Sequence, residues 1–325
     1  MPNYQGVWSL STQMQNRTGW PEFFPSQGTM LIGGGYTMAG ALTNTIQQID
    51  INEGGATATD FGDLTEANYG GRACSSATRA VFMGGNGASN TTSNVMAYVT
   101  VASAGNATDF GDLNLGVELG SACNSATRGI NGGGMVTNGG YKDNIQYFTI
   151  ASTGNASDFG NLSQAVRNLS ADSSSTRGVF FRGFNPSNSP SGRNTIEYIT
   201  IASTGNATDF GDSNFGGYSS WASCGSGVRS LDAKSGNTVD VEYITIASTG
   251  NATDFGDLNT ALRNDSTGAS GPTTALFQNY IVAGSGYKQV ESFTIATTGN
   301  AVNYGDLAAG QGYAGGTSNS NGGLQ

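Results

Sequence analysis

The sequence of 325 residues contains no histidine. This absence excludes a Ser-His-Asp triad and any zinc site with histidine ligands. Lysine and arginine together number only 13 against 23 acidic residues, which gives a formal net charge of −10. Because binding to phosphate backbones requires clustered cationic side chains, nucleic acid is not an expected partner.

Apolar stretches long enough to span a bilayer are also missing, and Met1-Pro-Asn-Tyr4 lacks the basic and apolar regions of a signal peptide. We therefore expect a protein made in a cytoplasm and not inserted into membranes. Cysteine occurs three times, and an odd number without a secretory signal argues against disulfides. Charged residues are scarce at 11% whereas glycine occurs 51 times, so the surface must rely on Ser, Thr, Asn and Gly.

What the chain does contain is a repeat. The motif Asp-Phe-Gly-Asp-Leu or a close variant occupies residues 60–64, 109–113, 158–162, 209–213, 254–258 and 303–307. Its central aromatic residue recurs at intervals of 49, 49, 51, 45 and 49 residues. A period of about 50 residues is the length of one four-stranded propeller blade.

The segments around each motif predict the four strands. Before the motif lies a stretch rich in β-branched and aromatic residues with a Gly-Asn turn, such as 194–207, which predicts a β-hairpin. Both faces of residues 196–202 are apolar, which is typical of a strand covered on both sides. After the motif come a small-residue segment such as 73–76 and an apolar segment such as 80–85. Small side chains suit the innermost strand, near the propeller axis.

This pattern resembles the kelch repeat, in which a double glycine follows one strand and aromatic residues mark two others. Gly84-Gly85 and Gly132-Gly133 hold the double-glycine position, whereas Gly183-Phe184 and Ala283-Gly284 depart from it. The first aromatic position is held by Tyr98, Tyr147, Tyr198 and Tyr243, and the last by the series from Phe61 to Tyr304. The resemblance implies an all-β fold, a six-bladed kelch-like β-propeller over residues 28–325.

The two ends of the repeat region predict how the ring closes. Residues 29–34 match the second strand of a blade, so this blade has no first strand of its own at the amino-terminal side. Residues 311–318 follow the last motif, where an innermost strand is expected. Pairing of these two segments completes the sixth blade and removes exposed sheet edges.

Several repeated polar residues invite chemical hypotheses. The cysteines are Cys74, Cys123 and Cys224, and the repeated arginines are Arg79, Arg128, Arg177 and Arg229. Equivalent strands of a six-bladed ring lie too far apart for a disulfide or a shared metal ion, so we expect buried thiols. Sialidases need an arginine cluster that faces an acid, whereas these arginines are spread one per blade. Salt bridging or hydrogen bonding to carbonyl groups is therefore the favoured role, and we expect no enzyme, cofactor or metal.

The paired aspartates of the motif leave one alternative open. Four copies keep both acids, for example Asp60 with Asp63, and calcium loops also use carboxylates. Calcium loops bring more oxygen ligands at closer spacing, so a role in capping turns is favoured. Asn106, Asn155, Asn206 and Asn251 begin glycosylation sequons, but each lies in the repeated turn, and a turn role is expected for them too.

Residues 1–27 lie outside the repeats and form a predicted docking segment, in which Trp8, Leu10, Met14 and Trp20 are the candidate contacts. The alternative is that this segment folds back onto the propeller as a plug. Its Gly-Val-Trp and Trp-Pro elements resemble segments that precede propeller domains in structural proteins of tailed bacteriophages. The repeated Thr-Ile-Ala-Ser-Thr-Gly-Asn-Ala-Thr-Asp-Phe-Gly-Asp-Leu sequence is similar to repeats of phage virion and tail-fibre proteins. The resemblance implies a virion protein, assembled in the host cytoplasm, with other virion proteins as partners.

Two functional hypotheses follow. The loops at 34–43, 85–93, 133–143, 183–193, 235–237 and 284–288 differ between repeats. Variable loops on a rigid scaffold commonly carry binding sites, which favours a tail-fibre adhesin that presents them to a host-surface glycan or protein. Candidate contacts for a neutral, hydroxyl-rich ligand are Asn138, Tyr141, Asn185 and Tyr287. The alternative is a non-catalytic capsid or tail decoration protein anchored by residues 1–27.

Overall fold

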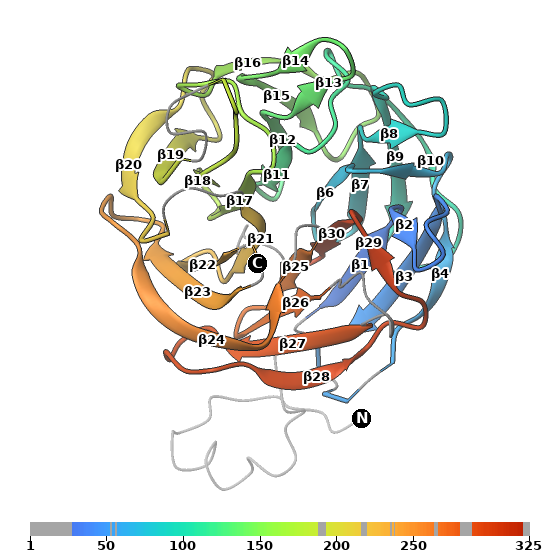
Figure 1. Ribbon diagram of the computed structural model, residues 1–325. Coiled ribbons are helices and arrows are strands. Elements are labelled where there is room, and N and C mark those ends of the chain that lie inside the picture. Colours follow the sequence, from blue (N-terminus) through green and yellow to red (C-terminus); the bar gives the residue numbers. More distant parts are fainter. Residues whose placement is uncertain are drawn as a thin grey trace, which may run out of the picture.

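A computed structural model describes residues 28–52, 54–55, 57–187, 193–215, 220–234, 236, 238–262, 266–279 and 288–320. Throughout these residues the regular elements are β-strands, and six four-stranded antiparallel sheets surround a central axis (Figure 1). The predicted six-bladed β-propeller is therefore confirmed. A search of the same residues finds no helix that is long and apolar enough to cross a membrane.

Each blade runs from an innermost strand near the axis to an outermost strand at the rim. In this order, blade 1 contains β30 (Gly315–Ser318), β1 (Thr29–Gly33), β3 (Thr45–Asp50) and β4 (Thr59–Asp63). Blade 2 contains β6 (Arg72–Ser75), β7 (Arg79–Met83), β9 (Val95–Thr100) and β10 (Thr108–Asp112). Blade 3 contains β11 (Ser121–Asn124), β12 (Arg128–Gly132), β15 (Asn144–Thr149) and β16 (Ser157–Asn161).

The remaining blades follow the same order. Blade 4 contains β17 (Ser170–Ser173), β18 (Arg177–Phe181), β19 (Thr195–Thr200) and β20 (Thr208–Asp212). Blade 5 contains β21 (Ser220–Gly225), β22 (Arg229–Lys234), β23 (Thr238–Thr245) and β24 (Thr253–Leu262). Blade 6 contains β25 (Thr267–Ser270), β26 (Thr274–Gln278), β27 (Gln289–Thr294) and β28 (Val302–Asp306). Small two-stranded sheets pair β2 (Tyr36–Thr37) with β29 (Gln311–Gly312), β5 (Asn68–Tyr69) with β8 (Asn86–Gly87), and β13 (Met135–Val136) with β14 (Gly140–Tyr141).

The ring closes in blade 1, as predicted. β30 pairs antiparallel with β1, from Gly33 opposite Gly315 to Met30 opposite Ser318. The closing segment is shorter than expected, because Gln311–Gly312 leaves the blade and pairs with β2 instead. Small residues are required in the inner strands: a side chain on Gly316 would place its Cβ 2.4 Å from Thr267 Oγ1 of blade 6.

The three cysteines lie on the inner strands β6, β11 and β21, where they are buried and free, as expected. Burial raises the pKa of the Cys74 thiol to about 12. Its Sγ lies 2.9 Å from the point where a Cβ on Gly129 of the next blade would stand. The same holds for Cys123 beside Gly178 at 2.7 Å. These thiols therefore fill space between blades that glycine leaves open.

The repeated motif joins each blade to the next through its backbone. Phe61 is bulged out of the β3–β4 ladder, since Gly62 pairs with Ile46 and Asp60 with Gln47. The Phe61 carbonyl accepts a hydrogen bond from Gly105 N of blade 2 at 2.7 Å, and Gly62 adopts a φ of 149° at this close approach. The same contact recurs at Phe110, Phe159, Phe210, Phe255 and Tyr304, whose partners are Gly154, Gly205, Gly250, Gly299 and Gly55.

The turn asparagines complete this junction. Asn106 Oδ1 accepts a hydrogen bond from Asp63 N at 3.0 Å, and Ala107 N donates to Asp63 O at 2.7 Å. Asn155, Asn206, Asn251 and Asn300 make the equivalent side-chain contact. The structural role predicted for the turn is thus correct, but the asparagine of the next blade, and not the motif's carboxylate, caps the backbone N–H group.

A second junction uses the repeated arginines, which hydrogen-bond to carbonyl groups, one of the two roles expected for them. Arg128 of blade 3 stacks its guanidinium 4.4 Å from the Tyr147 ring centroid and donates from Nη1 to Ile201 O of blade 4 at 2.7 Å. Arg79, Arg177 and Arg229 repeat this arrangement with Tyr98, Tyr198 and Tyr243 and with the carbonyls of Ile150, Ile246 and Ile295. We call each set an arginine clamp, and together the clamps join blades 2 to 6 in sequence.

Blades 6 and 1 lack the clamp residues. Thr274 and Thr29 hold the arginine position, which follows from their strand registers, and neither side chain can reach the next blade. At the closing junction, Tyr304 replaces the phenylalanine of the other motifs, and its hydroxyl donates to Asp50 O of blade 1 at 2.8 Å. This hydrogen bond takes the place of the missing arginine.

The closure predicts the effect of a truncation. A chain that ends at Ala314 lacks β30, which exposes the edge of β1 and opens the ring. We expect this chain to aggregate or to melt at a clearly lower temperature in a thermal scan monitored by circular dichroism. A chain that ends at Ser320 keeps β30 and serves as the control. Equal melting temperatures for both truncated chains would rule out closure by this strand.

The arginine clamp predicts a second stability change. Arg128→Ala removes both a cation–π contact and a charged hydrogen bond, so the free energy of unfolding in urea should fall by about 2 kcal/mol. Arg128→Lys keeps the charge but loses the planar stacking, so its free energy of unfolding is expected to lie between those of the parent and the Ala variant. An Ala variant within about 0.5 kcal/mol of the parent would show that the clamp does not stabilise the ring.

Candidate functional site

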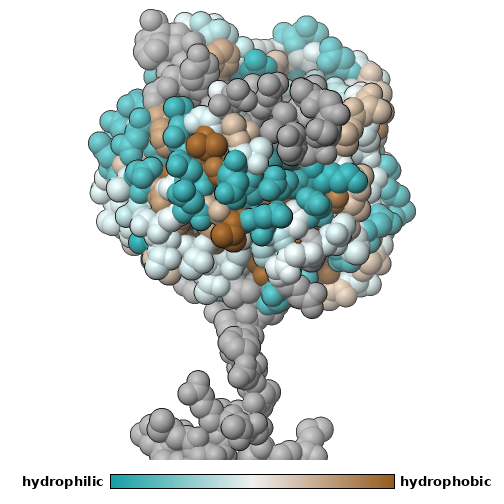
Figure 2. Space-filling model, turned by 60° about the horizontal axis from the view of Figure 1, so that its bottom comes forward, coloured by the Kyte–Doolittle hydropathy of each residue, from teal (hydrophilic) through white to brown (hydrophobic). Residues whose placement is uncertain are grey.

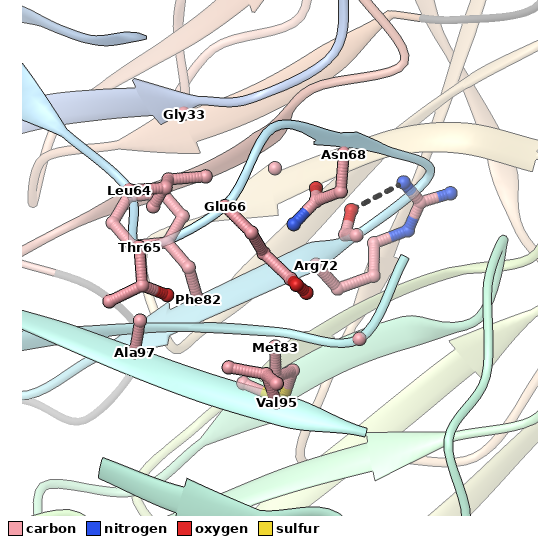
Figure 3. Close-up of a pocket in the computed structure, with 13 residues that line it drawn as sticks. Gly33, Leu64, Thr65, Glu66, Asn68, Arg72, Phe82, Met83, Val95 and Ala97 are labelled. Atoms are coloured by element: carbon pink, nitrogen blue, oxygen red, sulfur yellow. Dashed lines mark hydrogen bonds between the residues drawn. The ribbon is translucent and has the colours of Figure 1, made fainter. Parts of the chain in front are cut away.

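Three cavities among the described residues differ in size and place. A crevice between blades 1 and 2, lined by Leu64, Phe82 and Met83 among others, has room for about 10 Å³ (Figure 3). The space at the axis, between the inner strands, measures about 40 Å³. Such volumes hold one or a few water molecules. A third hollow, at the end of the ring that carries the variable loops, measures about 520 Å³ and is large enough for a small ligand.

We call this third cavity the tyrosine hollow. It is lined by Tyr36, Tyr69, Asn90, Glu118, Leu119, Met135, Thr137, Asn138, Arg167 and Tyr313. These residues come from two sources. The first is the loops that follow the second strands of blades 1 to 3. The second is the four links that join blade 6 to blade 1, blade 1 to blade 2, blade 2 to blade 3 and blade 3 to blade 4. The variable loops therefore contribute only part of the lining.

The links are held together by a chain of backbone hydrogen bonds that runs around the end of the ring. Gly70 N donates to Tyr313 O at 2.8 Å, Leu119 N to Gly70 O at 2.8 Å, and Asn168 N to Leu119 O at 2.7 Å. All four residues have positive φ angles between 54° and 68°, which Leu and Tyr rarely adopt. The requirement to bond to both neighbouring links explains this conformation. We call the four linked residues Tyr313, Gly70, Leu119 and Asn168 the collar. The collar forms the floor of the tyrosine hollow.

The double glycines bring the loops down onto the links. Gly35 N donates to Asn68 O at 2.6 Å, and Gly134 N donates to Val166 O at 2.8 Å. Both members of each pair have positive φ, and in blade 3 the pair is Gly133-Gly134, one residue later than predicted, because Gly132 ends β12. The residue after each pair, such as Tyr36, is thereby placed directly against a link.

Three tyrosines from distant parts of the chain meet at one end of the hollow. The ring centroids of Tyr36 and Tyr69 lie 4.8 Å apart, with an interplanar angle of 30°. Tyr313 meets Tyr36 at 6.0 Å and Tyr69 at 5.9 Å, edge to face in both cases. All three side chains are partly exposed. The cluster therefore presents aromatic surface in two perpendicular directions.

A buried carboxylate lies beside the tyrosines. Glu118 is only 4% exposed, and its Oε1 accepts hydrogen bonds from Asn86 Nδ2 at 3.0 Å and from Thr137 Oγ1 at 3.5 Å. Burial, the negative charge of Glu118 and a hydrogen bond to that carboxylate raise the pKa of Tyr69 to about 12. Burial, followed by the charge of Glu118, also raises the pKa of Tyr36. Both phenols therefore stay protonated at neutral pH and can act as donors.

Arg167 lies at the other end of the hollow. Its guanidinium carbon is 5.6 Å from the centroid of Tyr141 and 5.8 Å from that of Phe184, and Nη1 approaches Met135 Sδ at 3.2 Å. The ion pairs found in the described parts of the chain are Arg182–Asp232, Arg193–Glu197 and Lys234–Asp240. Neither Arg167 nor Glu118 belongs to one of these pairs, so the hollow holds two opposite charges without a direct salt bridge.

The predicted ligand contacts are only partly brought together. Asn138 lines the hollow, and Tyr141 reaches it through Arg167. Asn185 is 7% exposed, and its amide is already engaged: Nδ2 donates to Ala165 O of the link between blades 3 and 4 at 2.7 Å, and Oδ1 accepts from Ser187 N at 2.9 Å. Tyr287 and the docking candidates Trp8, Leu10, Met14 and Trp20 lie outside the described residues.

Sequence reasoning missed the central members of the hollow, namely Tyr36, Tyr69, Glu118, Arg167 and Tyr313. A signal was nevertheless present in the repeats. Gly312, Tyr69, Glu118 and Arg167 occupy one equivalent link position, and Tyr36, Asn86, Met135 and Phe184 occupy the position after the glycine pair. The backbone pairing is constant in these four described pairs while the side chains differ from one pair to the next, and such variation is typical of a binding surface.

The rest of the described surface offers less. On the side shown in Figure 2, hydrophilic and intermediate residues dominate, and hydrophobic side chains form small separate spots. The exposed large hydrophobic residues within the described ranges are Met38, Val228 and Val302, which belong to three different blades. Isolated apolar side chains are normal on a soluble surface and mark no interface.

A metal site was the alternative for the repeated aspartates. In the portion of the chain that the structure describes, no three His, Cys, Asp or Glu side chains come together in a way that could hold a metal ion. The first aspartate of the five motifs that carry one, such as Asp60 or Asp109, is exposed to solvent. The tyrosine hollow, with aromatic faces, amides, hydroxyls and two charges, is therefore the candidate site. Comparison with known protein families and with curated proteins finds no match to this chain.

Proposed function

We propose that this protein is a non-catalytic binding module of a bacteriophage-type virion, part of a tail fibre or related adhesin, and that the tyrosine hollow binds a saccharide on a host surface. The observation that carries the binding role is the hollow itself, a cavity of about 520 Å³ on the end of the ring that bears the variable loops. The virion location rests on the resemblance of the repeated segments to those of phage structural proteins.

The composition of the hollow suits a hydroxyl-rich ligand. Tyrosine rings offer apolar faces for stacking and hydroxyls for hydrogen bonds. Asn90 and Asn138 are exposed at the rim and supply amide donors and acceptors, and Thr137 adds a hydroxyl. The collar and the small sheets hold these groups in place before a ligand arrives, which lowers the entropic cost of binding.

A binding role without catalysis fits the same residues. Glu118, the carboxylate of the hollow, accepts hydrogen bonds from Asn86, Thr137 and Tyr69 and is not paired with a second acid. Glycoside hydrolysis commonly uses two carboxyl groups that face each other across the bond to be cleaved. The hollow supplies one carboxylate, so we propose recognition and not turnover.

The binding proposal predicts the outcome of a glycan array probed with the full-length chain. We expect binding to a subset of bacterial surface saccharides, and a loss of about fivefold or more in affinity for Tyr69→Ala, because stacking on an aromatic ring contributes about 1 kcal/mol or more. Val302→Ala, which alters a 62% exposed side chain on β28, is the control and should bind as the parent does.

If the full-length chain binds no saccharide on the array, or if Tyr69→Ala binds as well as the parent, this hollow is not a saccharide site. The role of a passive decoration or spacer protein of the capsid or tail then takes its place.

The docking segment carries a separate prediction. We propose that Trp8 and Trp20, with Leu10 and Met14, attach the protein to other virion proteins, since tryptophan is enriched among residues that dominate interface energies. Replacement of both tryptophans by alanine should leave a propeller that melts as the parent does but is not incorporated into particles. Incorporation is measured by quantifying the protein in purified virions. Normal incorporation of the double variant would move the attachment to the propeller.

A further inference from the structure

Among the residues that the structure describes, the charge of Glu118 has no cationic partner. Carboxylates are seldom as buried as this one unless a cation accompanies them, because loss of hydration disfavours the charged form. Glu118 is 4% exposed, and the side chains that donate hydrogen bonds to it, those of Asn86, Thr137 and Tyr69, are neutral. These hydrogen bonds satisfy the oxygen but leave the negative charge uncompensated at the floor of an open cavity.

The groups around Glu118 are those that attract a cation. Tyr36, Tyr69 and Tyr313 lie on the same side of the hollow, and the face of an aromatic ring carries negative electrostatic potential. Tyr313 stands nearly perpendicular to the other two rings, at 79° and 80°, so a bound group can meet ring faces from two directions. The net charge of −10 adds a general attraction for cations.

Arg167 does not occupy this end of the hollow. Its guanidinium is held near Tyr141 of blade 3 and Phe184 of blade 4, whereas the three tyrosines come from blade 1 and from the links on either side of it. The hollow is therefore divided into an acidic, aromatic end and a basic end. A cation is favoured at the first end and disfavoured at the second.

We infer that the tyrosine hollow recognises a saccharide bearing a protonated amine, that is, a cationic amino sugar, whose ammonium group binds beside Glu118 and over the tyrosine rings. This inference rests on the proposed saccharide-binding function and names the ligand class. It changes one expectation from the sequence, which was a neutral ligand, because the buried carboxylate of Glu118 was not foreseen.

The test compares two ligands that differ only in the amine. Isothermal titration calorimetry with the full-length chain uses tetramers of glucosamine and of N-acetylglucosamine. Acetylation removes the charge, so the glucosamine tetramer should bind at least about tenfold more tightly at low salt and neutral pH. Its affinity should fall as the pH rises through the pKa of the sugar amine and as salt is added.

Variants separate the role of Glu118 from a general effect on the fold. Glu118→Gln should abolish the preference for the amine, while Glu118→Asp should retain part of it. Arg167→Gln is the matched control within the hollow and should leave the preference intact or increase it. If Glu118→Gln does not fold, Tyr36→Leu, which removes one ring face from a partly exposed position, should reduce the preference instead.

Each outcome decides a different point. Equal affinities for the two tetramers would overturn the amine inference and leave saccharide binding standing. Binding of other saccharides on the array, with no binding of either tetramer, would likewise overturn the amine inference and leave saccharide binding standing. A preference that survives Glu118→Gln but disappears with Arg167→Gln would also overturn the inference. Failure of every saccharide would remove the proposed function itself.

Discussion

The contact on which the rest of the structure depends is the backbone junction between each Asp-Phe-Gly-Asp motif and the glycine turn of the next blade. The bulge exposes the carbonyl of Phe61 and pushes its ring into the core, where it is 3% exposed. The Phe61 carbonyl thus accepts a hydrogen bond from Gly105 of blade 2, and the Phe61 ring packs in the core between blades 1 and 2. Because glycine at position 62 has no side chain, the two backbones approach closely; a Cβ there would lie 2.3 Å from Gly105 O. The repeated glycine is a consequence of this approach.

Closing a ring from such units creates one junction that differs from the others. At the junction of blades 6 and 1, Gly55 donates to Tyr304 O and Ala58 donates to Asp306 O at 2.8 Å. The turn at this junction is one residue longer between these two donors than between Gly105 and Ala107, and the Tyr304 hydroxyl replaces the arginine clamp. The β30–β1 pairing then links the two ends of the propeller region through a full antiparallel ladder. The sequence differences at this junction therefore keep blades 6 and 1 in contact through other residues.

The fold was predictable because its determinants are local and repeated. The aromatic period, the Gly-Asn turns and the small residues of the inner strands each specify one strand of one blade, and the aromatic recurs in all six blades and the turn in five. The candidate site was less predictable, since Tyr36 and Tyr313 are far apart in the sequence and meet only because the ring closes. Asn138 was identified because it lies on a loop that varies. Asn185 was expected to contact a ligand for the same reason, yet its amide hydrogen-bonds to Ser187 of its own loop and to Ala165 of the neighbouring link. Loop variation alone does not reveal which side chains turn inward.

The repeat changes in blade 4, whose described loop residues are not part of the lining of the tyrosine hollow. Arg182 takes the first glycine position there, with a φ of 55°, and its guanidinium donates to the buried carboxylate of Asp232 in blade 5. Burial, followed by the charge of Asp232, raises the pKa of nearby Glu242 to about 7. The two acids Asp232 and Glu242 thus lie near the same cation, Arg182. In blades 1 to 3 the corresponding position is glycine, and the residue after the pair contacts a link. The same backbone position thus borders the tyrosine hollow on one side of the ring and holds a buried ion pair on the other. Because the backbone is shared, a change of side chain at this position alters the chemistry of that end of the ring without altering the propeller.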